Sequence, residues 1–114
     1  MPYLKLETNV EIPDDKVPAL MKRLSDAVVA VTGKPERVVQ VAVAGGGRML
    51  FAGSEEANAH VEVKGISFPE ESAKGMSEAV CAVLRDCLGI PGSRVYIAFV
   101  SYKGSMWGVD GRTF

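Results

Sequence analysis

The sequence predicts an α+β fold built from a strand–helix–strand unit that occurs twice. Two stretches of apolar residues have the spacing of an amphipathic helix, and each is followed by glycine, proline and an apolar strand. The halves also match in letters, since LSDAVVAV and GKPERVVQVAV (24–43) resemble MSEAVCAVL and GIPGSRVYIAFV (76–100). Two such units side by side form a four-stranded sheet with both helices on one face, plus short strands.

The first unit begins at the start of the chain. Residues 2–8 alternate between apolar and polar, which predicts a strand. Helical spacing follows over 17–31, and either Asp14 or Asp15 is placed to cap this helix. The run at 38–43 contains little that is polar, so we expect a strand buried on both faces.

The second unit follows a glycine turn at 45–47 and a short strand predicted over 48–53. A further strand is predicted over 58–66. Ser67–Glu70 then has the S-x-x-E pattern of a capping box, and helical spacing returns from 76 to 88. These signals predict that the second helix starts just after Ser67.

The last predicted elements are a strand at 93–101 and a short strand or tail at 107–114. Right-handed crossovers make the two long strands of each unit parallel. No helix remains to cover the second face of the sheet. We therefore expect other subunits to cover that face.

Length and composition indicate one globular domain over 1–114. The net charge of −1 and the scattered basic residues argue against a nucleic-acid partner. No apolar run is long enough to insert into a membrane, and no signal peptide is recognised at the start. We expect a cytoplasmic protein, with secretion without a signal peptide as the alternative.

The two cysteines, Cys81 and Cys87, fall on different faces of the second predicted helix. Both are expected to be small buried hydrophobic residues. Neither a disulfide nor a metal site is expected, because the chain has one histidine, His60, and no C-x-x-C motif.

The chain starts Met1-Pro2, and methionine is generally removed before a small second residue. Removal leaves the secondary amine of Pro2 at the end of a strand, where sheet pairing restrains a terminus that otherwise frays. A free α-amine has a pKa of about 7.7–8, and burial among apolar residues lowers it. A neutral amine near pH 7 is a competent general base.

The whole chain resembles the macrophage migration inhibitory factor (MIF) and D-dopachrome tautomerase family. The matching stretches are MPYLKLETNV at the start, TGKPERVV (32–39), FAGSEE (51–56), GIPGSRVYI (89–97) and WGVDGRTF (107–114). The resemblance implies the duplicated unit predicted above. It also implies a homotrimer whose sheets line a central barrel, with the site between subunits.

The resemblance assigns roles to individual residues. Pro2 matches the catalytic proline, and Lys34 matches the lysine that faces the substrate carboxylate. Ile66 and Phe114 match apolar residues of the pocket, and Tyr96 matches a tyrosine contributed by a neighbouring subunit. An ammonium group at Lys34 suits an anionic keto acid, because it also stabilises enolate charge.

Some positions depart from the family's cytokine member. Ala98 stands where that member has an asparagine that hydrogen-bonds the substrate. Trp107 and Val109 stand where it has valine and tryptophan, so the aromatic side chain of the pocket is kept but displaced. The segment 64–67 reads KGIS, where the family more often has Ser-Ile-Gly.

Arg37 and Arg94 occupy equivalent places in the repeat, each between a helix and the following strand. Both are candidates for a second anion contact, and an ordinary surface arginine is the favoured alternative. Arg37 also keeps open the family branch of dehalogenases and decarboxylases that use the same amine.

The resemblance thus predicts an isomerase, specifically a tautomerase of phenylpyruvate-like α-keto acids with Pro2 as general base. The reaction needs no cofactor, because the amine and a cation supply the base and the charge stabilisation. The alternative is a MIF-like cytokine that binds a cell-surface receptor, with weak or vestigial tautomerase activity. Thiol oxidoreductase activity is not expected, because residues 58–61 lack the cytokine's C-x-x-C.

Overall fold

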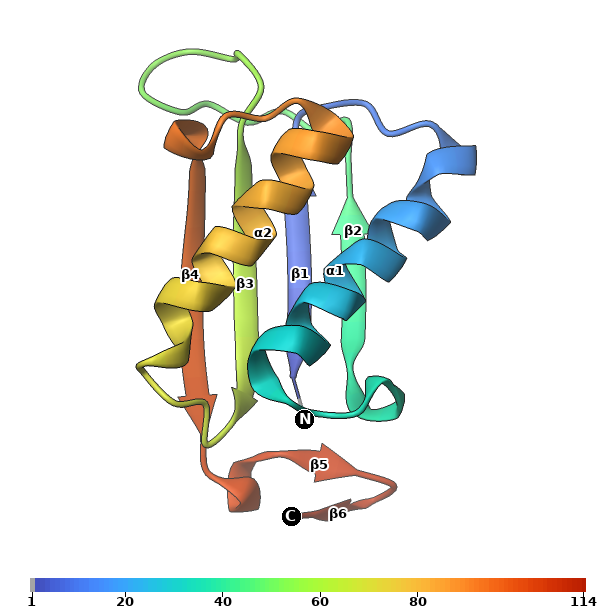
Figure 1. Cartoon of the computed structure of the whole chain (residues 1–114), viewed down its shortest axis with the longest axis vertical. Coiled ribbons are helices and arrows are strands. Elements are labelled where there is room, and N and C mark those ends of the chain that lie inside the picture. Colours follow the sequence, from blue (N-terminus) through green and yellow to red (C-terminus); the bar gives the residue numbers. More distant parts are fainter. Residues whose placement is uncertain (1) are drawn as a thin grey trace.

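The computed structural model describes residues 2–114. Its long elements, in chain order, are β1 (Tyr3–Thr8), α1 (Val17–Thr32), β2 (Gln40–Ala44), β3 (Ala59–Ile66), α2 (Ser72–Leu88) and β4 (Val95–Tyr102). A hairpin of β5 (Gly108–Val109) and β6 (Arg112–Thr113) closes the chain. Both helices cross one face of a four-stranded sheet, as the sequence predicts (Figure 1).

The strand order is β2-β1-β3-β4. Within each unit the two strands are parallel, and β1 and β3 join the units by antiparallel pairing at the centre of the sheet. The predicted duplication of a strand–helix–strand unit is therefore confirmed. Tyr3 pairs with Gln40 on one side and with Lys64 on the other, so the start of β1 is held between two strands.

The core lies between this sheet and the helices. Alternate residues of the central strands point toward the helices and are fully buried, and they meet the apolar stripes of α1 and α2. The fully buried apolar members are Leu4, Leu6, Val61, Val63, Leu24, Val28, Met76, Val80 and Leu84.

Glycines end both helices as predicted. Gly33 and Gly89 have φ values of 70° and 67°, in the left-handed region that glycine adopts without a steric penalty. Their backbone N–H groups donate to the carbonyls of Val29 and Arg85, which satisfies carbonyls at the helix ends.

The predicted helix starts were wrong in detail. Asp14 lies in a 3₁₀ turn that precedes α1, and no side chain caps either helix. α2 begins at Ser72 rather than just after Ser67, because a turn closed by a hydrogen bond from Ser72 N to the carbonyl of Pro69 comes first. Ser67 itself has φ 50°.

The second face of the sheet is not covered within the chain, and its two central strands carry charged side chains there. On β1, Lys5 Nζ lies 3.8 Å from Glu7 Oε1. On the neighbouring strand β3, Lys64 Nζ lies 3.3 Å from Glu62 Oε1. The strand predicted at 38–43 to be buried on both faces is instead the edge strand β2, with exposed residues at both ends.

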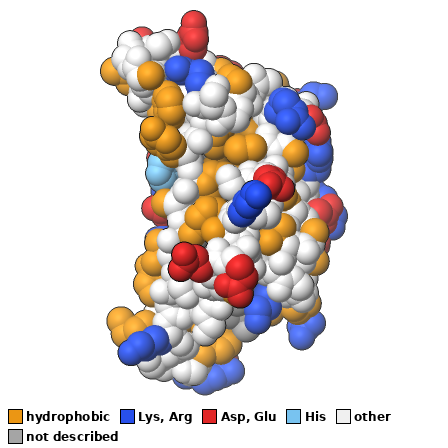
Figure 2. Space-filling view, turned by 60° about the vertical axis from the view of Figure 1, so that its left-hand side comes forward, with side chains coloured by type: hydrophobic (Ala, Val, Ile, Leu, Met, Phe, Trp, Pro, Cys, Tyr) orange, Lys and Arg blue, Asp and Glu red, His pale blue; other side chains and the backbone are white. Residues whose placement is uncertain are grey.

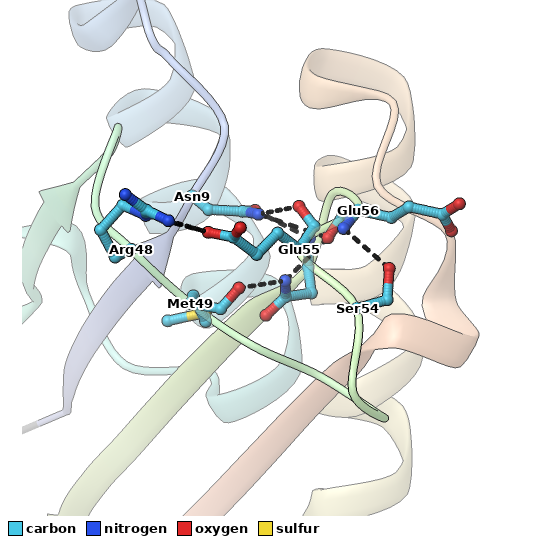
Figure 3. A network of polar contacts seen from close by, with 7 residues as sticks. Asn9, Arg48, Met49, Ser54, Glu55 and Glu56 are labelled. Carbon is cyan, nitrogen blue, oxygen red and sulfur yellow. Dashed lines mark hydrogen bonds and ion pairs between the residues drawn. The ribbon is translucent and has the colours of Figure 1, made fainter.

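The segment predicted as a short strand over 48–53 makes only a bridge between Phe51 and Ser54. Side-chain hydrogen bonds to backbone groups hold it instead (Figure 3). Asn9 Nδ2 donates to the carbonyl of Glu55 at 2.7 Å, and the buried Asn58 donates to the carbonyls of Met49 and Glu56.

The prediction that both cysteines are buried is met in part by Cys81 and is wrong for Cys87. Cys81 is half-buried, but Cys87 is exposed, and both are free thiols. Arg23 Nη1 donates to Cys87 Sγ at 3.3 Å. Cys87 lies in the last turn of α2, where Arg85 and Asp86 are exposed as well.

Several large apolar side chains reach the surface. They are Leu50, Tyr96, Met106, Val109 and Phe114. Figure 2 shows apolar side chains at the surface along the left-hand edge of the molecule. Among the described residues, no helix has the length and apolar character needed to cross a membrane.

Candidate functional site

Pro2 is buried and directly precedes β1, so it lies at the end of a central strand. Its carbonyl accepts a hydrogen bond from the backbone N–H of Gln40 at 3.0 Å. This bond continues the pairing of β1 with β2 and restrains the residue that the sequence predicts as the base. Met1, whose removal the sequence predicts, lies outside the described residues.

One cavity of about 180 Å³ opens beside Pro2, and we call it the Lys34 cavity. It is lined by Pro2, Thr32, Lys34, Gly65, Ile66, Ser67, Phe68, Pro69 and Ser72. The end of α1, the end of β3 and the start of α2 therefore meet at Pro2. Two of the predicted pocket residues, Lys34 and Ile66, line this cavity.

A second cavity of about 390 Å³ also opens beside Pro2, and we call it the Arg37 cavity. It is lined by Pro2, Arg37, Val38, Val39, Gln40, Trp107, Gly108, Val109 and Phe114. The predicted residues Trp107, Val109 and Phe114 lie here together. Among the described residues, Pro2 alone lines both cavities.

The C-terminal wall of the Arg37 cavity is held in place by local packing. The ring of Trp107 meets the ring of Tyr102 edge-on, with centroids 5.7 Å apart. The backbone N–H of Phe114 donates to the carbonyls of Gly104 and Trp107. A side chain at position 104 would bring a Cβ within 3.2 Å of Phe114 Cβ, so glycine permits this close approach.

The charges around Pro2 are positive. Lys34 and Arg37 are both exposed, and within the described residues neither side chain makes an ion pair or a hydrogen bond. Glu36 lies between them in sequence, but its Oε2 accepts a hydrogen bond from Lys22 Nζ at 2.7 Å. The pKa of Lys22 is raised by this hydrogen bond, and further by Asp26. No aspartate or glutamate lines either cavity.

Tyr96 lies away from the other predicted site residues. It is the second residue of β4, is 67% exposed and lines a separate cavity with Phe51 and His60. β4 starts at the end of the sheet opposite to Pro2, at the top of Figure 1. Within one chain Tyr96 and Pro2 therefore do not share a cavity. Ala98 lies on the same uncovered face, opposite Glu62 of β3.

Arg94 is not available as an anion contact. Its guanidinium donates to four backbone carbonyls, those of Phe51, Ser54, Glu56 and Ala57. It also lies over the Phe51 ring, 5.1 Å from the centroid. The structure therefore assigns Arg94 to holding the 48–57 segment, in contrast to its repeat counterpart Arg37.

Comparison with known proteins agrees with this architecture. The sequence profile described as macrophage migration inhibitory factor (MIF) matches residues 1–114. The chain belongs to the MIF family. A MIF homolog of Brugia malayi is 36% identical over 116 residues, covering 100% of this chain and 99% of that protein. The D-dopachrome decarboxylase of Bos taurus is 35% identical over 102 residues, covering 87% and 85%.

The fold of this MIF-family chain also matches a solved structure closely. The MIF homologue from Prochlorococcus marinus superposes with a TM-score of 0.92 at 33% identity, covering 98% of each chain. The α+β sheet and the two helices are thus those of the family.

Sequence reasoning missed several residues that line the cavities. Gln40 and Val39 could have been found from the parallel pairing of β1 with β2, which places the start of one strand beside the start of the other. Phe68, Pro69 and Ser72 gave no such signal, because the expected capping box placed the start of α2 too early.

Proposed function

We propose that this MIF-family chain is a keto–enol tautomerase of phenylpyruvate-like 2-keto acids, with the Pro2 amine as general base after removal of Met1. One observation carries the proposal: Pro2 is buried where two cavities meet, and each cavity holds a cation without a carboxylate. This arrangement suits a base that must be uncharged and a substrate that is an anion.

The burial of Pro2 supports the role of base. A charged amine loses solvation in an apolar setting, so burial favours the neutral form. The bond from Gln40 N to the carbonyl of Pro2 restrains the residue without using the amine. A fixed neutral amine keeps its lone pair for the substrate.

The chemistry is a proton transfer that leaves the atom count unchanged. The Pro2 nitrogen takes a proton from C3 of the keto acid, and the C–H electron pair becomes the C2–C3 double bond. The π electron pair of the C2 carbonyl moves onto its oxygen, and the protonated Pro2 nitrogen returns the proton to that oxygen, which completes the enol and restores the neutral amine. Lys34 pairs with the C1 carboxylate and stabilises the charge that develops on the C2 oxygen.

The uncovered surfaces support a homotrimer as the working form. β2 and β4 are both edge strands with unpaired backbone groups, and the large apolar side chains at the surface include Tyr96 and Phe114. In the proposed trimer, a neighbouring chain brings its Tyr96 to the Pro2 cavities. The uncovered sheet face would then line a central barrel. We also place the protein in the cytoplasm.

The test is turnover of phenylpyruvate by the purified protein, with intact mass used to check that Met1 is absent. Pro2→Gly and a form with one alanine added before Pro2 should both lose at least about a hundredfold in kcat/KM, the contribution typical of a general base. Size-exclusion chromatography checks that both variants keep the oligomeric state of the wild type. Unchanged turnover by the extended form would overturn the proposal.

A further inference from the structure

We propose that the Arg37 cavity is an anion subsite, so that the preferred substrates are 2-keto acids whose apolar body ends in a second carboxylate. This inference rests on the proposed tautomerase function, in which Lys34 binds the carboxylate next to the keto group. It adds a chemical preference at the other end of the substrate.

The first support is the state of Arg37. Among the described residues, it is the one arginine with no ion pair and no side-chain hydrogen bond. The five others bind carboxylates or carbonyls: Arg23, Arg48, Arg85, Arg94 and Arg112. A guanidinium presents a planar fork of donors that matches a carboxylate in two parallel hydrogen bonds. Arg37 has this capacity unused.

The second support is that Glu36, the acidic residue next to Arg37 in the chain, already has an ion-pair partner. Lys22 binds Glu36 at 2.7 Å and also lies 3.0 Å from Asp26. Glu36 is thus held by a cation on α1. No acidic side chain lines the Arg37 cavity, so the charge of Arg37 is available to a ligand.

The third support is the apolar lining of the Arg37 cavity. Trp107 and Phe114 lie on the same cavity, together with Val39 and Val109. Apolar walls bind the carbon body of a ligand and reduce the water around a charged pair, which strengthens that pair. A cation at the rim of an apolar cavity fits a ligand that is apolar in the middle and anionic at the end.

The arrangement of the two cavities sets the orientation in which the substrate binds. Lys34 lines the smaller cavity and Arg37 the larger one, and Pro2 is the residue between them. A substrate with a carboxylate at each end therefore places one end at each cation and the carbon to be deprotonated at Pro2. The larger cavity, of about 390 Å³, takes the body of the substrate.

Binding tests the subsite without relying on turnover. Cinnamate and 4-carboxycinnamate share a skeleton and differ by one carboxylate, and calorimetry gives the dissociation constant of each. We expect the wild type to bind the dianion at least tenfold more tightly than the monoanion. Arg37→Gln should remove most of that ratio. Arg85→Gln removes the same charge on the exposed side of α2, and it should preserve the ratio.

Turnover tests the same point in the reaction. The ratio of kcat/KM for 4-carboxyphenylpyruvate over 4-methylphenylpyruvate should fall about tenfold in Arg37→Gln, mostly through KM, and Arg37→Lys should recover part of it. Equal ratios in wild type, Arg37→Gln and Arg85→Gln would overturn the subsite. A wild type that binds the dianion through Arg37 but turns over neither acid would overturn the tautomerase function and leave the subsite supported.

Discussion

The backbone N–H of Gln40 donates to the carbonyl of Pro2 at 3.0 Å, and this bond ties the first described residue of the chain to the edge strand β2. Chain termini commonly fray. Here Tyr3 also pairs with Lys64 of β3, so strands flank the terminus on both sides. A base that must meet one carbon atom of its substrate gains from this restraint.

Removing the bond between Gln40 and Pro2 should lower catalysis. In Gln40→Pro the N–H is lost, whereas in Gln40→Ala it is kept and only the side chain is shortened. We expect kcat for phenylpyruvate to be about tenfold lower in the proline variant than in the alanine variant, because Pro2 becomes less well positioned. Steady-state kinetics of the pair measure the difference. Equal kcat values would show that the bond does not position the base.

Freeing Glu36 should weaken the binding of anionic substrates. Lys22→Ala leaves the Glu36 carboxylate without its 2.7 Å partner and close in sequence to Lys34 and Arg37. We expect KM for phenylpyruvate to rise severalfold with kcat nearly unchanged, since the carboxylate competes with substrate for the cations. The double variant Lys22→Ala with Glu36→Gln removes the competing charge and should return KM toward the wild-type value. A KM that stays high in the double variant would contradict this explanation.

Arg94 should contribute to stability rather than to substrate binding. Its guanidinium donates to four carbonyls of the 51–57 segment, and Arg94→Ala removes that charged donor from all of them. The carbonyls of Phe51, Ser54 and Glu56 keep another hydrogen bond. We expect a loss of about 2 kcal/mol in the free energy of unfolding, because hydrogen bonds from a charged donor are among the stronger ones. Urea denaturation at fixed protomer concentration measures it. The affinity for cinnamate should change little, in contrast to Arg37→Gln.

Ser67 is a residue in the left-handed region, with φ 50°, on the wall of the Lys34 cavity. Ser67→Gly should stabilise the fold by about 1 kcal/mol, because glycine adopts this conformation without the penalty of a Cβ. Thermal unfolding at fixed protomer concentration measures the change. Ser93→Gly is the matched control, since Ser93 lies in a 3₁₀ turn without positive φ. A Ser67→Gly protein that is no more stable than wild type would contradict the prediction.

The sequence predicted the elements whose signals are local. The stripes of apolar residues in α1 and α2, the glycines that end them and the repeat of the unit are all short-range patterns, and the structure agrees with each. The failures were also local in origin. The S-x-x-E pattern at Ser67 predicts a helix start, but the segment forms a turn before α2 instead.

Equivalent residues of the repeat show where the sequence alone is insufficient. Arg37 and Arg94 follow the two helices at equivalent positions, so the sequence pattern predicts the same role for both. In the structure Arg94 meets the 48–57 segment, which supplies four carbonyls, whereas Arg37 meets the open cavity beside Pro2. The difference arises from the segment packed against each arginine and not from the arginine's own neighbours in sequence.

The sequence by itself determined the duplicated α+β fold. Its resemblance to the MIF family implied a site formed by Pro2, Lys34, Ile66, Trp107, Val109 and Phe114, with Tyr96 from a neighbouring subunit. The tertiary structure decided that they form two cavities with Pro2 between them, and that Tyr96 lies at the other end of the sheet. The physical reason is that helix and turn signals act over a few residues. The two cavities depend instead on strand pairing and chain ends that bring together segments around 2, 34–40, 65–72 and 107–114.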